Sequence, residues 1–292
     1  FAGGSPPTGH SRIDRLDYSS DTSTAAPKGN LTVGRRKHTA TGNKSHGYIG
    51  GGTNPGAPTL STVDRIDYSN DTATAPSKGP LNNAGSGKGA VSSRENALPT
   101  ENIYSTYASS SEEVSGTRNT LPGYGYIAGA AGPPALSSVD RIDYDNDTST
   151  ALVRGPMTRV DYYLTGLSNT SYGYNCGGLP YTSEVDRIDY ANDTATASPK
   201  GPLSATNGAA AGLHNNDYGY HAGGNNPSNT STVERIDYSN DTATGLVRGY
   251  LSTGRGKMAG TSNKDYGWLA GGKEPPISTS ERIDFSNDLT TA

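Results

Sequence analysis

The chain has few of the residues that usually form a hydrophobic core or cross-link a small domain through disulfides. Among 292 residues there are one Cys, two Met, one Trp and two Phe. A single Cys excludes an intrachain disulfide, and no apolar run approaches the roughly 20 residues that span a bilayer. The net charge is only −4, with scattered charges and no basic stripe. We therefore expect neither a nucleic-acid partner nor insertion into a membrane.

Hydrophobic residues make up only 31% of the chain, which is low enough to raise the question of disorder. Disordered chains combine low hydrophobicity with high net charge, however, and the net charge here is small. Nineteen Tyr, most of them at recurring positions, supply apolar area that a count of aliphatic residues misses. We therefore expect the chain to fold.

One ten-residue string, Val-Asp-Arg-Ile-Asp-Tyr-Ser-Asn-Asp-Thr at 63–72, recurs with small changes along the whole chain. The steps between copies are 50, 76, 46, 48 and 47 residues, so the period is about 48 residues and one interval contains an insertion, within 94–121. A constant period of this size indicates a repeat architecture. We number the units 1 to 6 by the central Asp of the string: Asp17, Asp67, Asp143, Asp189, Asp237 and Asp284.

Each unit predicts four short strands. In unit 2, the small polar residues 37–43 predict an innermost strand and Gly-Tyr-Ile-Gly at 47–50 a second one. Alternation over 63–68 predicts the third strand, Ser-Asn-Asp-Thr at 69–72 a turn, and 72–75 the returning fourth strand.

Four-stranded units of this kind cannot bury their faces singly, but a radial arrangement buries them against their neighbours. We therefore predict one all-β domain over residues 1–292, a six-bladed β-propeller of four-stranded repeats. Residues 1–4 match the middle of a unit, as at 269–272. The ring is accordingly expected to close near the two termini.

The units resemble Kelch repeats. Residues 48–51 are similar to that family's apolar run with a double glycine, and residues 67–71 to its turn segment. The resemblance covers all six units and implies a Kelch-type propeller. It departs where the family has a Trp on the fourth strand, since small residues such as Thr74, Thr196 and Thr244 occur there. That departure implies thinner blades.

The full repeat string also resembles repeats of large structural and tail-fibre-like proteins of marine bacteriophages, especially cyanophages. This resemblance implies a virion or extracellular location and a part in host attachment.

Arg and Asp recur on the third strand of every unit, which argues for a structural role because an active site rarely needs six copies. Arg suits bidentate contacts with carboxylates, so we predict a ladder of contacts to the next blade. Its residues are Arg65, Asp67, Arg141, Asp143, Arg187, Asp189, Arg235 and Asp237.

Two patterns hint at metals without completing a site. Asp67, Ser69 and Asp71 match the first three ligand positions of a calcium loop, but the Gly at position 6 and the Glu at position 12 are missing. We interpret this turn as capped by Asp side chains, with calcium binding left open. Cys176 lies two residues from Tyr174, as a radical-copper oxidase would need, yet the five His show no repeated axial placement. We predict a small buried Cys instead, and no cofactor.

A constant scaffold with variable loops is how binding surfaces are built, and the loops after the second strands vary here. No hydrolase, zinc-protease or phosphate-loop motif is present. We predict a non-enzymatic binding or structural module that contacts a cell-surface glycan or other virion subunits. The candidate ligand-binding residues, whose rings and amides suit sugars, are Tyr104, Tyr107, Asn54, Tyr181, Asn225 and Asn226.

Two alternatives stay open. One is a carbohydrate-active enzyme, an epimerase or oxidase, on the same propeller. The other is a purely architectural repeat of a longer fibre. A homo-oligomer is compatible with each of them.

Overall fold

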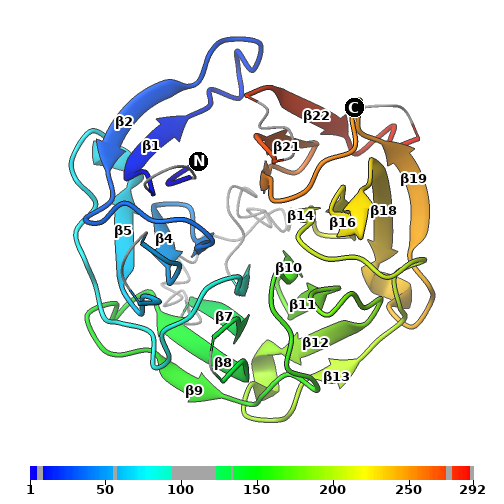
Figure 1. Ribbon diagram of the computed structural model, residues 1–292, viewed down its shortest axis with the longest axis horizontal. Helices are drawn as coiled ribbons and strands as arrows, with labels where there is room; N and C mark the ends of the chain where they lie inside the picture. Colours follow the sequence, from blue (N-terminus) through cyan, green and yellow to red (C-terminus); the bar gives the residue numbers. More distant parts are fainter. Residues whose placement is uncertain (5–8, 55–57, 94–122, 133, 274–277, 290–292) are drawn as a thin grey trace, which may run out of the picture.

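The structure, a computed structural model, describes residues 1–4, 9–54, 58–93, 123–132, 134–273 and 278–289. Its strands form antiparallel sheets that follow one another around a common axis, so that unit 1 (blue) lies next to unit 6 (red) in the ring (Figure 1). The prediction of an all-β propeller is confirmed. Helical structure in these residues is limited to three short 3-10 turns, and no helix there is long and apolar enough to cross a membrane.

Units 3, 4 and 5 each form a four-stranded sheet whose strands pair in chain order. The innermost strands of neighbouring units contact each other around the axis. Unit 3 contains β6 (Gly89–Ser92), β7 (Tyr124–Ala130), β8 (Leu136–Asp143) and β9 (Leu152–Arg154). Unit 4 contains β10 (Thr165–Ser168), β11 (Tyr172–Cys176), β12 (Val185–Asp189) and β13 (Ser198–Pro199). Unit 5 contains β14 (Ala211–His214), β15 (Tyr218–Ala222), β18 (Thr232–Asp237) and β19 (Leu246–Tyr250), with the small hairpin β16 (Asn225–Asn226) and β17 (Ser228–Asn229) after β15.

The other units show fewer strands among the described residues. Unit 2 contains β3 (Thr39–Gly42), β4 (His46–Gly50) and β5 (Val63–Asp67), and unit 6 contains β20 (Ala259–Ser262), β21 (Tyr266–Ala270) and β22 (Ser280–Asp284). Unit 1 contains β1 (Arg12–Arg15) and β2 (Ala26–Asn30), with a bridge from Ala2 to Ile13 on the axial side of β1. The first three strands predicted for unit 2 are thus confirmed.

The fourth strand was predicted too early. Residues 72–75 form no strand, because 72 and 73 continue the turn and 74 and 75 are irregular. The pairing residue in unit 2 is Ser77, which bridges Asp64. The reason is the cap: Asp67 Oδ1 accepts hydrogen bonds from the backbone N–H and the hydroxyl of Ser69 (2.9 and 2.6 Å) and winds residues 68–70 into a 3-10 turn. Several more residues are needed before the chain returns to the sheet.

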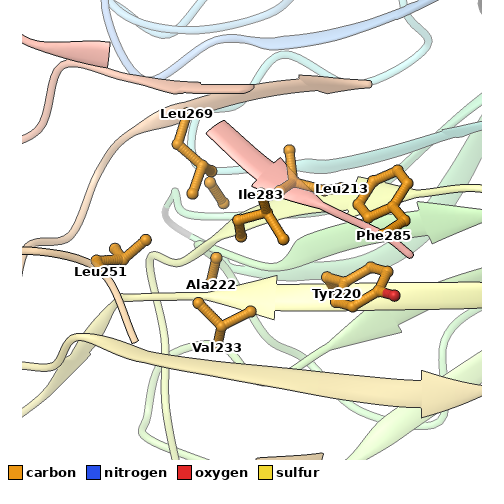
Figure 2. Close-up of a cluster of buried hydrophobic side chains, with 9 residues drawn as sticks. Leu213, Tyr220, Ala222, Val233, Leu251, Leu269, Ile283 and Phe285 are labelled. Carbon is orange, nitrogen blue, oxygen red and sulfur yellow. The ribbon is translucent and has the colours of Figure 1, made fainter. Parts of the chain in front are cut away.

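The tyrosines account for much of the packing between units. In units 2 to 6 the aromatic residue of the second strand is almost fully buried and stacks on the aromatic residue that follows the third strand of the next unit. In units 5 and 6 this pair is Tyr220 and Phe285, 4.8 Å apart between ring centroids, and it belongs to a cluster of buried side chains that also contains Leu213, Leu269 and Ile283 (Figure 2). The other pairs, with centroids 4.2 to 4.9 Å apart, are Tyr48–Tyr144, Tyr126–Tyr190, Tyr174–Tyr238 and Trp268–Tyr18.

The third-strand arginines join the units in a closed cycle. Each guanidinium contacts the second Asp of the turn in the next unit at 2.7 to 3.0 Å, and the last contact returns to unit 1. The pairs are Arg15–Asp71, Arg65–Asp147, Arg141–Asp193, Arg187–Asp241, Arg235–Asp288 and Arg282–Asp21. Arg282–Asp21 joins the two ends of the ring.

The third-strand arginines contact the next unit, as the ladder required, but the third-strand aspartates do not. The third-strand aspartates Asp67, Asp143, Asp189 and Asp237 each accept the N–H two residues later and so cap their own turns. A carboxylate occupied by its own turn cannot also reach the neighbouring sheet. The aspartate four residues further along makes that contact instead.

Candidate functional site

A ring of left-handed residues lies at one end of the axis. The residue two positions before each described inner strand has φ between 56° and 64°: Lys37, Gly87, Tyr163, Ala209 and Lys257. From the second member on, each backbone N–H donates to the carbonyl of the preceding member, at 2.5 to 3.0 Å. A left-handed conformation costs a non-glycine residue about 1 kcal/mol or more and is common at functional sites. Here four residues other than glycine adopt it: Lys37, Tyr163, Ala209 and Lys257.

The variable loops border the same end. The residue beside each ring member forms an isolated bridge with the segment that follows the second strand of its own unit. These bridges are Arg36–Thr53, Ser86–Ala131, Tyr162–Leu179, Gly208–Asn225 and Gly256–Lys273. The ring and the loops therefore share one face of the propeller.

A hollow of about 140 Å³ opens on this face between units 4, 5 and 6. It is lined by Tyr163, Leu179, Tyr181, Ala209, Asn225, Pro227 and Lys257. It combines two phenol rings, an amide and an amine, and Tyr181 is 39% exposed. Pockets for drug-sized ligands usually measure about 300 to 1,000 Å³. This one accommodates a single ring or substituent of a larger ligand.

Two of the sequence-predicted binding residues, Tyr181 and Asn225, come together in this hollow. Asn226 lies next to it and donates to the Thr206 hydroxyl at 2.8 Å. Asn54 follows Thr53 on the same face, but in unit 2. The predicted residues Tyr104 and Tyr107 lie outside the described part of the chain, as does the insertion.

Sequence reasoning missed the ring members Tyr163 and Lys257. A signal for them existed in the repeat: each lies six residues after the Leu or Met that opens its unit, here Met157 and Leu251. The left-handed backbone that orients them is not visible in the residue types, since Lys and Tyr rarely adopt it.

Units 4 and 5 also carry buried polar side chains where the other units are apolar. The residue after the second-strand aromatic is Ile49, Ile127 or Leu269 elsewhere, but Asn175 and His221 here. Both are 1% exposed, and the Asn175 amide atoms and His221 Nε2 have no hydrogen-bond partner in the structure. Burial lowers the pKa of His221 to about 4, so its ring is neutral at pH 7.

A second departure places two carboxylates where unit 2 has a buried ion pair. In unit 2, Arg35 pairs with Asp64 at 2.7 Å, and both side chains are fully buried. The equivalent of Arg35 in unit 4 is Asp161, which faces the carboxylate of Asp186. Burial, the main cause, and nearby carboxylates raise the pKa of Asp161, although Arg159 at 3.4 Å opposes the shift. Buried polar atoms without partners are rare in native proteins and call for an explanation. In the described residues they occur in units 4 and 5 and also in units 2 and 3, at His38 Nδ1, Lys88 Nζ and Asp140 Oδ1.

A larger hollow of about 340 Å³ lies between turns of units 4 and 5, lined by Asn169, Asn216, Asp217, Tyr218, Asp237, Tyr238 and Ser239. It belongs to the repeated turns, where Asp237 already caps Ser239. Because equivalent turns recur around the ring, this hollow distinguishes no part of the molecule. The smaller one is the better candidate.

The metal and redox alternatives find little support in the geometry. No group of three or more His, Cys, Asp and Glu side chains in the described residues is arranged to hold a metal ion. In the calcium-like turn, Asp67 caps Ser69 while Asp71 binds Arg15 at 2.8 Å, so the two carboxylates do not converge. Cys176 is fully buried, and burial raises the pKa of its thiol far above the usual range, which makes it unreactive.

Comparison with known proteins identifies the fold. No family model and no curated protein matches the chain. Among solved structures, one described as "Structure of YjhT" matches with a TM-score of 0.69 and 11% sequence identity, covering 98% of this chain and 94% of that one. At this identity the likeness shows the fold alone. The chain is a β-propeller with a Kelch-like repeat fold, similar to YjhT over nearly its full length.

Proposed function

We propose that the chain is a six-bladed propeller that binds a cell-surface glycan without transforming it. Six sequence units and a cycle of six arginine–aspartate contacts support the blade number. Unit 1 contributes β1, β2 and the bridged residue Ala2 as its blade.

The observation that carries the binding proposal is the composition of the 140 Å³ hollow. Tyr163 and Tyr181 offer aromatic faces to the apolar side of a sugar ring. Asn225 offers an amide that can both donate to and accept from hydroxyl groups. The hollow lies among the variable loops, where a repeat scaffold concentrates its specificity.

The setting we propose for this binding is host attachment by a phage tail or fibre. Support comes from the resemblance of the repeat string to phage fibre proteins, and from a binding face that is separate from the rim of the ring. The partners are then a bacterial surface glycan on one side and other virion subunits on the other.

The test is binding of the purified chain to a panel of bacterial surface polysaccharides. Stacking of one aromatic ring contributes about 0.5 to 1.5 kcal/mol, so Tyr181→Ala should weaken saturable binding roughly two- to tenfold. Asn225→Ala should act similarly through its hydrogen bonds. Tyr250→Ala is the matched control, because Tyr250 is also exposed (53%) but belongs to the outer strand β19. A variant lacking residues 94–121 tests the contribution of Tyr104 and Tyr107.

Saturable binding that survives both hollow variants and is lost with residues 94–121 would place the site in the insertion. Failure of the wild-type chain to bind any glycan, together with assembly into higher oligomers, would favour the architectural alternative.

One observation favours the enzyme alternative: His221, with its unpartnered Nε2, is the cross-strand neighbour of the buried Glu234. Proton NMR of any bound sugar incubated with the chain tests it directly. Turnover that disappears in His221→Phe would establish an enzyme and refute the non-enzymatic proposal.

A further inference from the structure

We propose that the inner side of unit 1 is a docking surface for a partner protein, which adds an extended hairpin carrying a Tyr or Trp to the ring. This inference is independent of glycan binding and concerns how the propeller joins another subunit.

Unit 1 differs from the other units on the side that faces the axis. In the described part of the chain, units 2 to 6 each have an inner strand, namely β3, β6, β10, β14 and β20. In unit 6, β20 pairs with β21, and Ala259 lies opposite Ala270. Ala2 is the equivalent of Ala270, since each pairs with the third strand of its own unit. No described strand occupies the place beside Ala2 that β20 occupies beside Ala270.

The inner strand of unit 6, which neighbours unit 1 in the ring, is more exposed than its equivalents. Ala259 and Gly260 are exposed and Thr261 is half-buried, whereas the same three positions of β6, β10 and β14 are buried, half-buried and buried. Between units 5 and 6 the third position is covered by the next unit, because Leu213 Cδ1 lies 2.5 Å from where a Cβ on Gly267 would be. Among the described residues, unit 1 has no second-strand residue that covers Thr261 in this way.

The aromatic residue after the third strand of unit 2 is also uncovered. Its equivalents Tyr144 and Phe285 stack on the second-strand ring of the preceding unit, and each is 8% exposed. Tyr68 is 47% exposed, and no ring in the described residues stacks on it. One face of the Tyr68 ring is therefore available to an aromatic side chain from outside these residues.

The carboxylate of Asp71, in the turn after Tyr68, lacks the aromatic donor that its equivalents have. In each of the other units this carboxylate accepts a hydrogen bond from a Tyr O–H or a Trp N–H of the preceding unit. In unit 1 it is Asp21, 2.8 Å from Trp268 Nε1. Asp71 binds Arg15 at 2.8 Å, but in the described residues no aromatic side chain donates to it.

These features define the chemistry of the occupant. An extended strand can bond to the backbone edge at Ala2 and so extend the sheet, a common mode of peptide recognition. A Tyr or Trp that follows it can stack on Tyr68 while its O–H or N–H donates to Asp71. A glycan has no backbone edge to pair, and a second copy of the chain has its described inner strands already paired. A partner polypeptide with a free hairpin therefore fits best.

The probe is a fluorescein-labelled synthetic peptide of residues 256–268, which contains β20 and ends at Trp268. Its binding to the full 292-residue chain is measured by fluorescence anisotropy. We expect saturable binding and a rise in the midpoint of thermal unfolding, because a ligand that binds only the folded state stabilises it. Tyr68→Ala in the chain and Trp268→Ala in the peptide should each weaken binding roughly two- to tenfold, the range of one aromatic stack. Together they should weaken it little more than either alone, since they remove opposite members of one contact.

Tyr250→Ala is the matched control in the chain, because Tyr250 is an exposed tyrosine on the outer strand β19 and should leave peptide binding unchanged. Absence of saturable binding would overturn the proposal. Losses from Tyr68→Ala and Trp268→Ala that multiply would place the peptide elsewhere and overturn it too. Self-association of the chain that excess peptide does not reverse would assign the surface to a second copy instead. The Trp268→Ala peptide tests the contact even if Tyr68→Ala impairs folding.

Discussion

Replacement of Asp147 by Ala should break one of the side-chain contacts that connect neighbouring units, which we call joints. Its carboxylate accepts a hydrogen bond from Tyr48 Oη at 2.9 Å and contacts Arg65 Nη1 at 2.8 Å and Lys78 Nζ at 3.2 Å, all from the preceding unit. Asp147 is 8% exposed and Tyr48 is fully buried. One side chain therefore satisfies three groups across the interface between units 2 and 3.

The magnitude follows from what the substitution leaves behind. A buried hydroxyl without a partner costs about 1 to 3 kcal/mol, and loss of one member of a buried ion pair costs about 3 to 5 kcal/mol. Arg65 remains 27% exposed and is partly rehydrated, so the lower end applies. We expect a loss of about 3 kcal/mol in the free energy of unfolding.

The assay is equilibrium unfolding in urea at pH 7, followed by the fluorescence of the single Trp. Asp145→Ala is the control, because Asp145 is an exposed carboxylate in the same turn. In a double-mutant cycle, Tyr48→Phe and Asp147→Ala should show a coupling energy of about 1 kcal/mol. Stability of Asp147→Ala within about 0.5 kcal/mol of Asp145→Ala would refute the account of the joint.

The same joint should depend on pH. Burial alone would raise the pKa of Asp147, but the hydrogen bonds from Tyr48, Lys78 and Arg65 outweigh it and lower that pKa below its usual value. The stabilisation is therefore complete above the unfolded-state pKa of about 3.9 and is lost as the pH falls through the lower folded-state pKa. The difference between wild type and Asp147→Ala should shrink below about pH 4 and stay constant from pH 5 to 8.

Three further predictions concern the inner strands and the departures from the repeat. Asp161→Asn should stabilise the chain by about 1 kcal/mol at pH 8 and by less at pH 5, because burial raises the folded-state pKa of this carboxyl and makes its ionisation costly; equal gains at both pH values in urea titrations would contradict this. Gly166→Ala should cost about 3 kcal/mol, since its Cβ would lie 1.9 Å from the Ala90 carbonyl oxygen, whereas Gly132→Ala, with no atom closer than 3.6 Å, should be tolerated. Tyr124→Leu should cost about 0.5 to 1 kcal/mol through loss of the Arg141 guanidinium 4.0 Å from its ring centroid, and an unchanged urea midpoint would exclude that contribution.

The periodicity of the sequence was sufficient to predict the sheets, because their pairing is local within each unit. The third strand at 63–67 was evident from alternation, and the second from Tyr and Gly. The fourth strand was misplaced because the choice between turn and strand at 72–75 depends on the cap at Asp67. A hydrogen bond from one side chain to the backbone two residues later leaves no periodic trace.

The contacts between units were harder to predict, because each unit has two aspartates at its turn and either could bind the arginine of the preceding unit. Composition cannot distinguish Asp67 from Asp71, and only the geometry shows that the first caps its turn while the second binds Arg15. The binding residues divide in the same way. Tyr181 and Asn225 were predicted from loop composition, whereas Lys257 required the left-handed backbone to be seen.

The arrangement of the joints explains why function can be confined to part of a nearly symmetric ring. Arginine–aspartate pairs hold each unit to the next through the third strand and the following turn, and stacked aromatics reinforce this contact from units 2 to 6. The third-strand and turn positions are therefore nearly invariant in all six units. Asn175, His221 and Asp161 do not take part in these joints. They could therefore replace apolar or paired residues without opening the ring. Unsatisfied polar atoms lower stability wherever they are buried, and those of Asn175 and His221 lie in units that also line the hollow. We propose that these two side chains are retained for binding at that face. If so, Asn175→Ile, which restores the residue of units 2 and 3, should raise the free energy of unfolding by about 1 kcal/mol and weaken glycan binding at the same time. A gain in stability with unchanged binding would show that the departures are neutral.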